Sequence, residues 1–341
     1  MSVDQAADRR VLEFAHTALI VGADRDLPSV LVPELHRSAE IYDEVLLVVS
    51  AQTRAALADA AAEVRPDVVS WGEPAAFYQR LGSAYEAFRR CLTAQHQAGR
   101  RLHVIAEPDL AAAVDPGFRA ERTTAYLAYE AVCNDTYAIG GSAVTCIWDS
   151  RDHQDTVIDG IRATHAYELT STGPAPSPRH LPPERYLAER HDVPARPAPS
   201  RPDRDVTLHE FAELGVLRSV MGTWAAGHDV AEEGAEDLVV AVIEVATNGL
   251  RHGQAPVRVR AWRDGDTLLV QCDDTGDQPI PATAGYYRPQ PLAVTAGGRG
   301  LWLARQLADV VTVSSAPGRT SVRLHFPRQL MRLRFPPISR R

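Results

Sequence analysis

The first half of the chain alternates short apolar runs with longer amphipathic stretches. Four apolar runs have the length of buried strands, namely residues 17–22, 44–50, 102–106 and 144–148. Apolar positions recur at helical spacing over residues 27–39, 75–98 and 117–138. Strands that alternate with helices in this way usually form a mostly parallel sheet covered by helices. We therefore predict an α/β fold for this half of the chain.

The second half has a different pattern, with one strong helix and two strand pairs. Helical spacing runs over residues 237–250, where the apolar stripe consists of Leu238, Val242, Val245 and Ala246. Two alternating runs, 257–263 and 267–274, are joined by a loop containing Asp-Gly, which is typical of a tight hairpin. A second strand pair is expected over residues 310–314 and 320–326.

A stretch rich in proline and arginine separates the two halves. Residues 193–205 read VPARPAPSRPDRD, which favours neither a helix nor a central strand. With 341 residues, 45% of them hydrophobic, the chain can build two cores. We predict a first domain over residues 10–192, a linker over 193–205, a second domain over 206–328 and a basic tail over 329–341.

Composition excludes several kinds of chemistry. All 36 basic residues are arginine, so a P-loop lysine, a Schiff base and a pyridoxal anchor are ruled out. The net charge of −8 offers no general attraction for nucleic acid or an anionic membrane. The four cysteines lie far apart without paired metal spacing, which favours reduced thiols over disulfides or zinc. Without a signal segment or a membrane-length apolar run, we expect a cytoplasmic protein.

The helix over residues 237–250 carries candidate catalytic chemistry. Glu244 and Asn248 lie four residues apart, and Arg251 shares their stripe. A carboxylate can deprotonate an attacking hydroxyl, and an amide oxygen is a hard ligand suited to Mg²⁺. The same pattern also fits an ordinary amphipathic helix with a solvated polar edge.

Further candidates for nucleotide binding follow in order along the chain. Asp274 ends a strand, where it can accept a hydrogen bond from an exocyclic amine such as that of adenine, and Gly276 allows a base to approach. Residues 277–296 are expected to form a lid. The glycine-rich turn 297–300 opens a helix, where backbone amides favour phosphate. Thr320 can donate a hydrogen bond from a strand edge toward the adenine side. Each feature alone is also common in ordinary turns and strands.

Taken together, residues 205–328 resemble the GHKL, or Bergerat-fold, ATPases, and among them the anti-sigma factor serine kinases of actinobacteria. The matching motifs are Glu244 and Asn248, then Asp274-Thr275-Gly276, Gly298-Arg299-Gly300-Leu301 and Gly318-Arg319-Thr320. Two residues depart from the family pattern: Gln278 replaces a frequent second glycine, and Arg251 replaces a frequent lysine.

This resemblance implies an α+β ATPase sandwich that binds ATP and Mg²⁺. It assigns Glu244 as the general base, Asn248 as the magnesium ligand and Asp274 as the reader of adenine. It also implies that the segment around Gly298, Arg299, Gly300 and Leu301 wraps the phosphates, and it adds Arg251, Gly276 and Thr320 to the nucleotide-binding residues.

Residues 14–190 resemble the MEDS sensory domain, a RecA-like module without its own P-loop. The matching residues are His16 with the ALIVGADRD segment, Tyr129-Glu130, Asn134, the segment 146–149 and the region of His165. The ends of parallel strands usually carry ligands, which places Asp24, Glu107, Asp109 and Asp149 on the expected functional rim. His16 is open to two interpretations, a satisfied core histidine or a ligand-facing, pH-sensing group.

These resemblances together imply a signalling regulator in which a sensory domain controls an ATP-dependent serine/threonine kinase. The expected partners are a sigma factor and a STAS-type anti-anti-sigma protein, with no direct contact to nucleic acid or membrane. The sequence is also compatible with a homodimer. One alternative is a nucleotide-dependent binding module without phosphotransfer. Another is a sensor histidine kinase, because Leu208-His209-Glu210 resembles a phosphoacceptor box. We instead expect His209 to be an exposed residue on the first helix of the ATPase fold.

Overall fold

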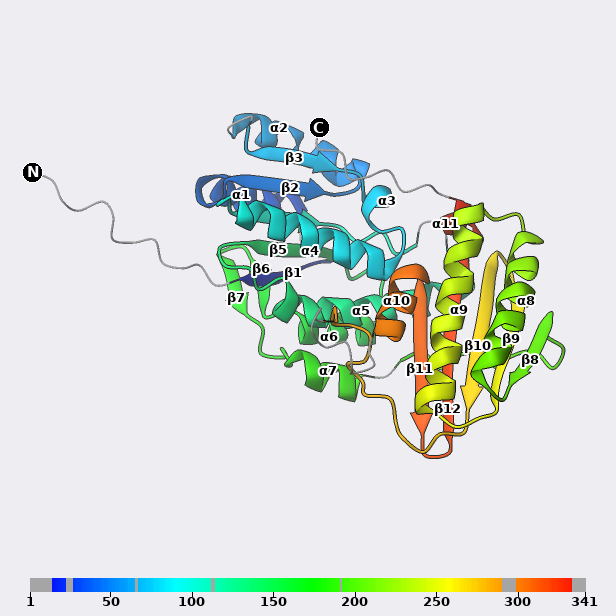
Figure 1. The fold of residues 1–341 in the computed structure, drawn as a ribbon. Helices are drawn as coiled ribbons and strands as arrows, with labels where there is room; N and C mark the ends of the chain where they lie inside the picture. Colours follow the sequence, from blue (N-terminus) through cyan, green and yellow to red (C-terminus); the bar gives the residue numbers. More distant parts are fainter. Residues whose placement is uncertain are drawn as a thin grey trace, which may run out of the picture. The chain divides into compact units, whose positions relative to one another are not determined.

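A computed structural model describes residues 14–22, 27–64, 67–111, 114–190, 192–289 and 299–332 (Figure 1). The chain divides into two compact units. The first contains residues 1–78, 86–109 and 130–186, and the second contains residues 79–85, 110–129 and 187–341.

The first unit is built on a seven-stranded sheet with the order β3-β2-β4-β5-β1-β6-β7. Its strands are β1 (Ala15–Val21), β2 (Glu44–Val48), β3 (Val69–Gly72), β4 (Leu102–Ala106), β5 (Ala143–Asp149), β6 (Tyr167–Thr170) and β7 (Gly173–Pro176). All neighbouring pairs are parallel except β6 with β7. The predicted mostly parallel sheet is thus confirmed.

Seven helices occur among the described residues of the N-terminal half. They are α1 (Leu27–Ile41), α2 (Ala51–Glu63), α3 (Pro74–Phe77), α4 (Leu81–Gln97), α5 (Arg119–Thr136), α6 (Asp155–Thr164) and α7 (Pro183–Glu189). A short 3₁₀ turn, η1 (Pro116–Phe118), precedes α5. The helix predicted over residues 75–98 is divided into α3 and α4, with residues 78–80 between them.

The central strands β1, β2, β4 and β5 of the seven-stranded sheet are buried on both faces. On one face Leu19, Leu47 and Ile147 pack with residues of α1 and α2 in a single apolar cluster. Because side chains alternate along a strand, His16 and Cys146 point to the opposite face. That second face therefore carries a histidine and a cysteine on neighbouring strands.

The second unit contains a separate five-stranded antiparallel sheet with the order β11-β12-β10-β9-β8. Its strands are β8 (Arg204–Leu208), β9 (Val257–Asp264), β10 (Thr267–Asp274), β11 (Val310–Ala316) and β12 (Arg319–Pro327). Both predicted hairpins are present. The edge strand β8 begins at Arg204, inside the stretch predicted to be a linker.

Helices cover one face of this antiparallel sheet, and α8 and α9 pack beside each other (Figure 1). The helices of this part of the chain are η2 (Phe211–Glu213), α8 (Leu214–Ala226), α9 (Glu232–His252), α10 (Arg299–Leu307) and α11 (Arg328–Arg332). The apolar stripe predicted for α9 is buried against Val259, Val270 and Leu324 of the sheet. Burial of such side chains stabilises the unit by roughly 1.5–3 kcal/mol each.

Helix α11 takes up the first residues of the predicted basic tail, and residues 333–341 lie outside the described part of the chain. Within the described ranges, no helix combines the length and the apolar character that crossing a bilayer requires.

Candidate functional site

The long helix α9 presents Glu244 and Asn248 one turn apart, and both residues are half-buried. They face the first turn of α10. A β-carbon at Gly300 would lie 2.8 Å from Glu244 Oε2, 2.8 Å from Asn248 Nδ2 and 3.2 Å from Asn248 Oδ1. Glycine at position 300 therefore lets the helix backbone approach both polar side chains directly. The carboxylate, the amide and the start of α10 form one wall.

Asp274 lies at the other end of this wall, where β10 meets the C-terminal end of α9. Its Oδ1 accepts a hydrogen bond of 2.9 Å from the backbone N–H of Gly276. A β-carbon at Gly249, the residue after Asn248, would lie 3.5 Å from Asp274 Oδ2. Burial raises the pKa of Asp274, against the lowering effect of backbone hydrogen bonds from Gly276 and Gln254.

Thr320 lies beside Asp274 in the sheet. The two residues are direct partners in the β10–β12 register, so their side chains emerge on the same face. Thr320 is buried, and its hydroxyl lies 3.3 Å from the hydroxyl of Ser315. The Ser315 hydroxyl in turn accepts a 3.1 Å hydrogen bond from the backbone N–H of Ile280. This network links the start of β12 to the segment that follows Asp274.

Other predicted site residues are placed less directly. Arg251 and Arg299 are exposed at the ends of their helices, and Leu301 is buried in the apolar core. Gly298 lies outside the described residues, as does the predicted lid from residue 290 onward. The described part of the lid, residues 277–289, contains turns but neither helix nor strand.

The structure adds two glycines to the predicted constellation, Gly249 and Gly253. A β-carbon at Gly249 would meet Val257 and Asp274, and one at Gly253 would clash with the Asp274 carboxylate. Glycine inside a helix costs about 1 kcal/mol relative to alanine. Gly249, directly after Asn248 in a strongly periodic helix, was therefore the available sequence signal for a close approach.

His209 is exposed, but it is not on a helix. It follows β8 and precedes η2, while α8 begins only at Leu214. The predicted helical placement is therefore wrong. A capping box formed by Glu210 and Glu213 starts η2 at this point, and Glu213 also accepts a hydrogen bond from the His209 backbone N–H.

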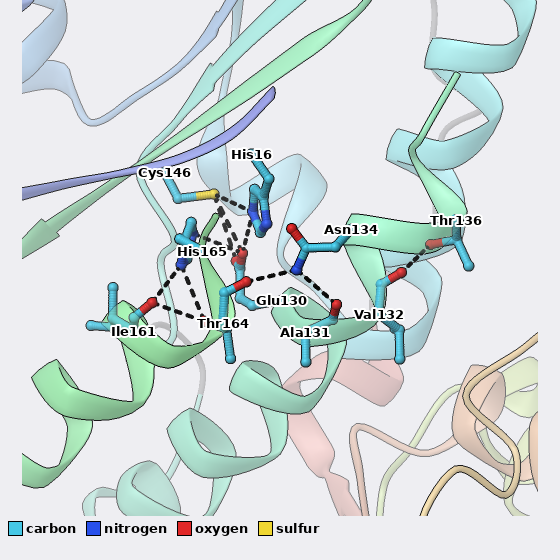
Figure 2. A network of polar contacts seen from close by, with 10 residues as sticks. All are labelled: His16, Glu130, Ala131, Val132, Asn134, Thr136, Cys146, Ile161, Thr164 and His165. Carbon is cyan, nitrogen blue, oxygen red and sulfur yellow. Dashed lines mark hydrogen bonds and ion pairs between the residues drawn. The ribbon is translucent and has the colours of Figure 1, made fainter. Parts of the chain in front are cut away.

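In the first unit, four residues of the predicted sensory match come together in the core: His16, Glu130, Cys146 and His165 (Figure 2). Burial lowers the pKa of His16 to about 4 and raises the pKa of the Cys146 thiol well above its usual value. Burial also acts to raise the pKa of Glu130, but its interactions with the two neighbouring histidines outweigh burial and hold that pKa well below the usual range.

Two of the predicted rim residues, Glu107 and Asp149, are engaged in local contacts. Glu107 Oε2 accepts a 2.9 Å hydrogen bond from the backbone N–H of Ser50. Asp149 forms an ion pair with Arg151. Asp24 lies outside the described residues, and Asp109 is partly buried near the end of β4.

Two family models match the chain. Residues 15–166 match the MEDS model, described as the MEthanogen/methylotroph, DcmR Sensory domain. Residues 209–326 match the histidine kinase-like ATPase domain. No curated protein matched the chain.

Solved structures show distant likenesses. A structure of the RsbU and RsbW domains of a Mycobacterium tuberculosis protein is 20% identical, with a TM-score of 0.28, covering 38% of this chain and 32% of that one. The Acinetobacter baumannii histidine kinase AdeS is 8% identical, with a TM-score of 0.22, covering 37% and 68%. The histidine kinase domain of the E. coli osmosensor EnvZ is 15% identical, with a TM-score of 0.22, covering 42% and 96%.

Likenesses this distant say nothing about activity, so the family models carry the identification. The matched ranges agree with the two sheets, because the parallel sheet lies mainly within residues 15–166 and the antiparallel sheet mainly within residues 209–326. The chain therefore contains a MEDS sensory domain, matched over residues 15–166, followed by a histidine kinase-like ATPase domain, matched over residues 209–326.

Proposed function

We propose that the chain is a signalling regulator of the anti-sigma factor type, with an ATP- and Mg²⁺-dependent kinase site under the control of its sensory domain. The substrate is a serine or threonine hydroxyl on a STAS-type anti-anti-sigma protein. A sigma factor is the second partner, so that phosphorylation of one partner decides whether the other is held.

The observation that carries this proposal is the wall formed by Glu244, Asn248 and Gly300, with Asp274 at its end. Histidine kinase-like ATPase domains bind ATP, usually with Mg²⁺. The wall has the donor set for this ligand, since it combines a carboxylate base, an amide oxygen and a carboxylate acceptor for an amine. Bound Mg²⁺ supplies positive charge that offsets the charge of the phosphates.

Each residue has a separate role in the proposed reaction. Asp274 accepts the adenine amine, and Asn248 holds the cation against the phosphates. Glu244 takes the proton from the partner's hydroxyl as that oxygen bonds to the γ-phosphorus, while the bond from the γ-phosphorus to the bridging oxygen breaks and ADP leaves. Positioning and electrostatics account for most of the acceleration in such transfers.

The experiment that tests the proposal incubates the full chain with γ-labelled ATP, Mg²⁺ and a candidate anti-anti-sigma protein. Acid-stable label on serine or threonine of the partner supports the kinase. Saturable nucleotide binding without labelled protein supports the binding-module alternative, which the exposed Gln278 at the frequent second-glycine position favours. Acid-labile label on His209 supports a histidine kinase, although residues 192–203, ahead of His209, contain no helix.

A side chain at position 300 is expected to impair transfer without unfolding the domain. In Gly300→Ala the added β-carbon displaces the ends of Glu244 and Asn248, which it would approach to 2.8 Å. A displacement of about 1 Å at a reacting centre can lower the rate by about 100-fold. The transfer rate and the melting temperature should be measured together. Gly215→Ala on α8 is the control, because nothing lies within 4 Å of its added carbon; equal rates in the two variants contradict the proposed wall.

Nucleotide affinity is expected to fall with acidification at a higher pH than an ordinary aspartate would give. Burial raises the pKa of Asp274, and only the carboxylate form offers a charge-assisted acceptor to the adenine amine. Affinity is therefore full above that pKa and declines as pH falls through it. Titration calorimetry over a pH series measures the decline, which Asp274→Asn should abolish. An unchanged pH profile in this variant refutes the role of Asp274.

A further inference from the structure

Four metal-ligating side chains meet in the interior of the first unit (Figure 2). His16 lies on β1, Cys146 on β5 and Glu130 on α5, and His165 caps the C-terminal end of α6. Their exposed fractions are between 0% and 2%. One ligand atom from each residue lies within 4.8 Å of those from the other three.

The fold brings these residues together through strand register and helix packing. Strands β1 and β5 are parallel neighbours in which His16 pairs with Val144 and Ala18 with Cys146. His16 and Cys146 therefore lie on the same face, two residues apart in register. Helix α5 lays Glu130 over that face, and His165 reaches it from the residue directly after α6.

The separations match the edges of a tetrahedral zinc site. Glu130 Oε2 lies 2.9 Å from His16 Nε2 and 3.3 Å from His165 Nε2. Cys146 Sγ lies 3.5 Å from Glu130 Oε2 and 3.8 Å from His16 Nε2. Zinc bonds of about 2.0–2.3 Å place the ligand atoms of a tetrahedron about 3.3–3.8 Å apart. Of these four separations, only the shortest has to widen, by a few tenths of an ångström, to admit the ion.

The hydrogen bond of His165 fixes which of its nitrogens faces the cluster. Nδ1 lies 2.8 Å from the carbonyl oxygen of Ile161, and a carbonyl can only accept, so Nδ1 carries the proton. The neutral ring then points the lone pair of Nε2 at the carboxylate of Glu130, and this nitrogen has no hydrogen-bond donor. Two acceptors 3.3 Å apart repel one another unless a proton or a metal ion lies between them.

Asn134 supports the same tautomer in His16. Its amide nitrogen donates to the carbonyl oxygens of Ala131 and Thr164, at 2.9 and 2.7 Å. The amide oxygen is therefore left as an acceptor beside the His16 ring (Figure 2). A proton on His16 Nδ1, which otherwise has no partner, can be directed to this oxygen. Metal-bound histidines are commonly oriented by such an outer hydrogen bond.

Charge balance also favours a divalent cation. A thiolate, a carboxylate and two neutral imidazoles carry a total charge of −2, which one divalent ion cancels inside a core where unpaired charge is costly. Nitrogen, sulfur and oxygen ligands in a tetrahedral arrangement suit Zn²⁺ better than Mg²⁺ or Ca²⁺.

We propose that His16, Glu130, Cys146 and His165 bind one Zn²⁺ ion in the core of the sensory domain. Four protein ligands leave no open position for water, so the site is structural rather than catalytic. The ion joins β1, β5, α5 and α6, and the thiol proton of Cys146 is released to solvent when it binds.

The test uses the full chain, purified without added metal and dialysed against buffer that contains a weak chelator. We expect about one zinc per chain by elemental analysis, and a fall in melting temperature after removal with a strong chelator that added Zn²⁺ reverses. Reloading with Co²⁺ should give the absorption of a tetrahedral thiolate complex. A chain that contains no zinc, takes up no Co²⁺ and melts at the same temperature with and without Zn²⁺ overturns the proposal.

Cys146→Ser is the diagnostic variant, and Cys272→Ser is its control, because Cys272 is a buried thiol outside the cluster. Cys146→Ser should weaken zinc binding by roughly 100-fold or more, since even outer hydrogen-bond partners change metal affinity by about 10- to 100-fold. It should also abolish the thiolate absorption of the Co²⁺ form. Full zinc content with unchanged absorption in Cys146→Ser places the ion elsewhere and refutes the site. Should Cys146→Ser fail to fold, Glu130→Gln provides the same comparison.

Discussion

Exchange of Glu244 for glutamine is expected to slow phosphate transfer by roughly 10²- to 10⁴-fold, the usual contribution of a general base. Glutamine keeps the shape and the hydrogen-bonding reach of the side chain, but its amide cannot take a proton from the attacking hydroxyl. The contact with the start of α10 is retained, so affinity for Mg²⁺-ATP should stay nearly unchanged. Single-turnover transfer and calorimetric titration of the full chain separate the two effects.

The control for this variant is Glu236→Gln on the same helix. Glu236 is exposed near the N-terminal end of α9 and lies two turns away from Glu244. The same chemical exchange there should leave both transfer and binding intact. A transfer rate in Glu244→Gln equal to that of Glu236→Gln would show that Glu244 is not the base.

The helix that carries the site could be predicted because its pattern is local. Leu238, Val242 and Val245 repeat at helical spacing and are buried as expected, which places Glu244 and Asn248 on an adjoining stripe. The proximity of Gly300 to both residues could not be derived in this way. It depends on the packing of α10 against α9, which no periodicity encodes, and only the family resemblance indicated it.

The pairing of strands that lie far apart in the sequence is a second feature that the sequence patterns could not predict. Asp274 and Thr320 are direct partners only because β12 pairs with β10 rather than staying in its hairpin with β11 alone. Sequence patterns define strands but not the order of strands in a sheet. Helix α2 was missed for a local reason, since its alanine-rich sequence AQTRAALADAAAE has little difference between its two faces.

The buried cluster of histidines, glutamate and cysteine in the first unit could not be predicted from sequence patterns either. Paired cysteine and histidine spacing detects metal sites built from one loop or one hairpin. His16, Glu130, Cys146 and His165 come from four elements, so no spacing rule finds them. The expectation of free thiols agrees with the four free cysteines among the described residues, but it overlooked that one of them lies between two histidines and a carboxylate.

Removal of the amide at position 248 is expected to impair both binding and transfer, unlike the change at Glu244. In Asn248→Ala the proposed oxygen ligand of Mg²⁺ is lost, so affinity for Mg²⁺-ATP should fall by at least roughly 10-fold, as for other weakened metal sites. Transfer should fall further, because the phosphates are no longer held in line with the hydroxyl.

The dependence on magnesium makes this prediction specific to the proposed role. With a chelator present, the wild-type chain and Asn248→Ala should bind ATP alike, and only the wild type should gain affinity when Mg²⁺ is added. Thr247→Ala, at the neighbouring half-buried position of α9, should gain affinity as the wild type does. If Asn248→Ala gains as much affinity from Mg²⁺ as the wild type, another group holds the cation. Because Glu244→Gln should keep the full magnesium effect, the two variants separate the ligand from the base.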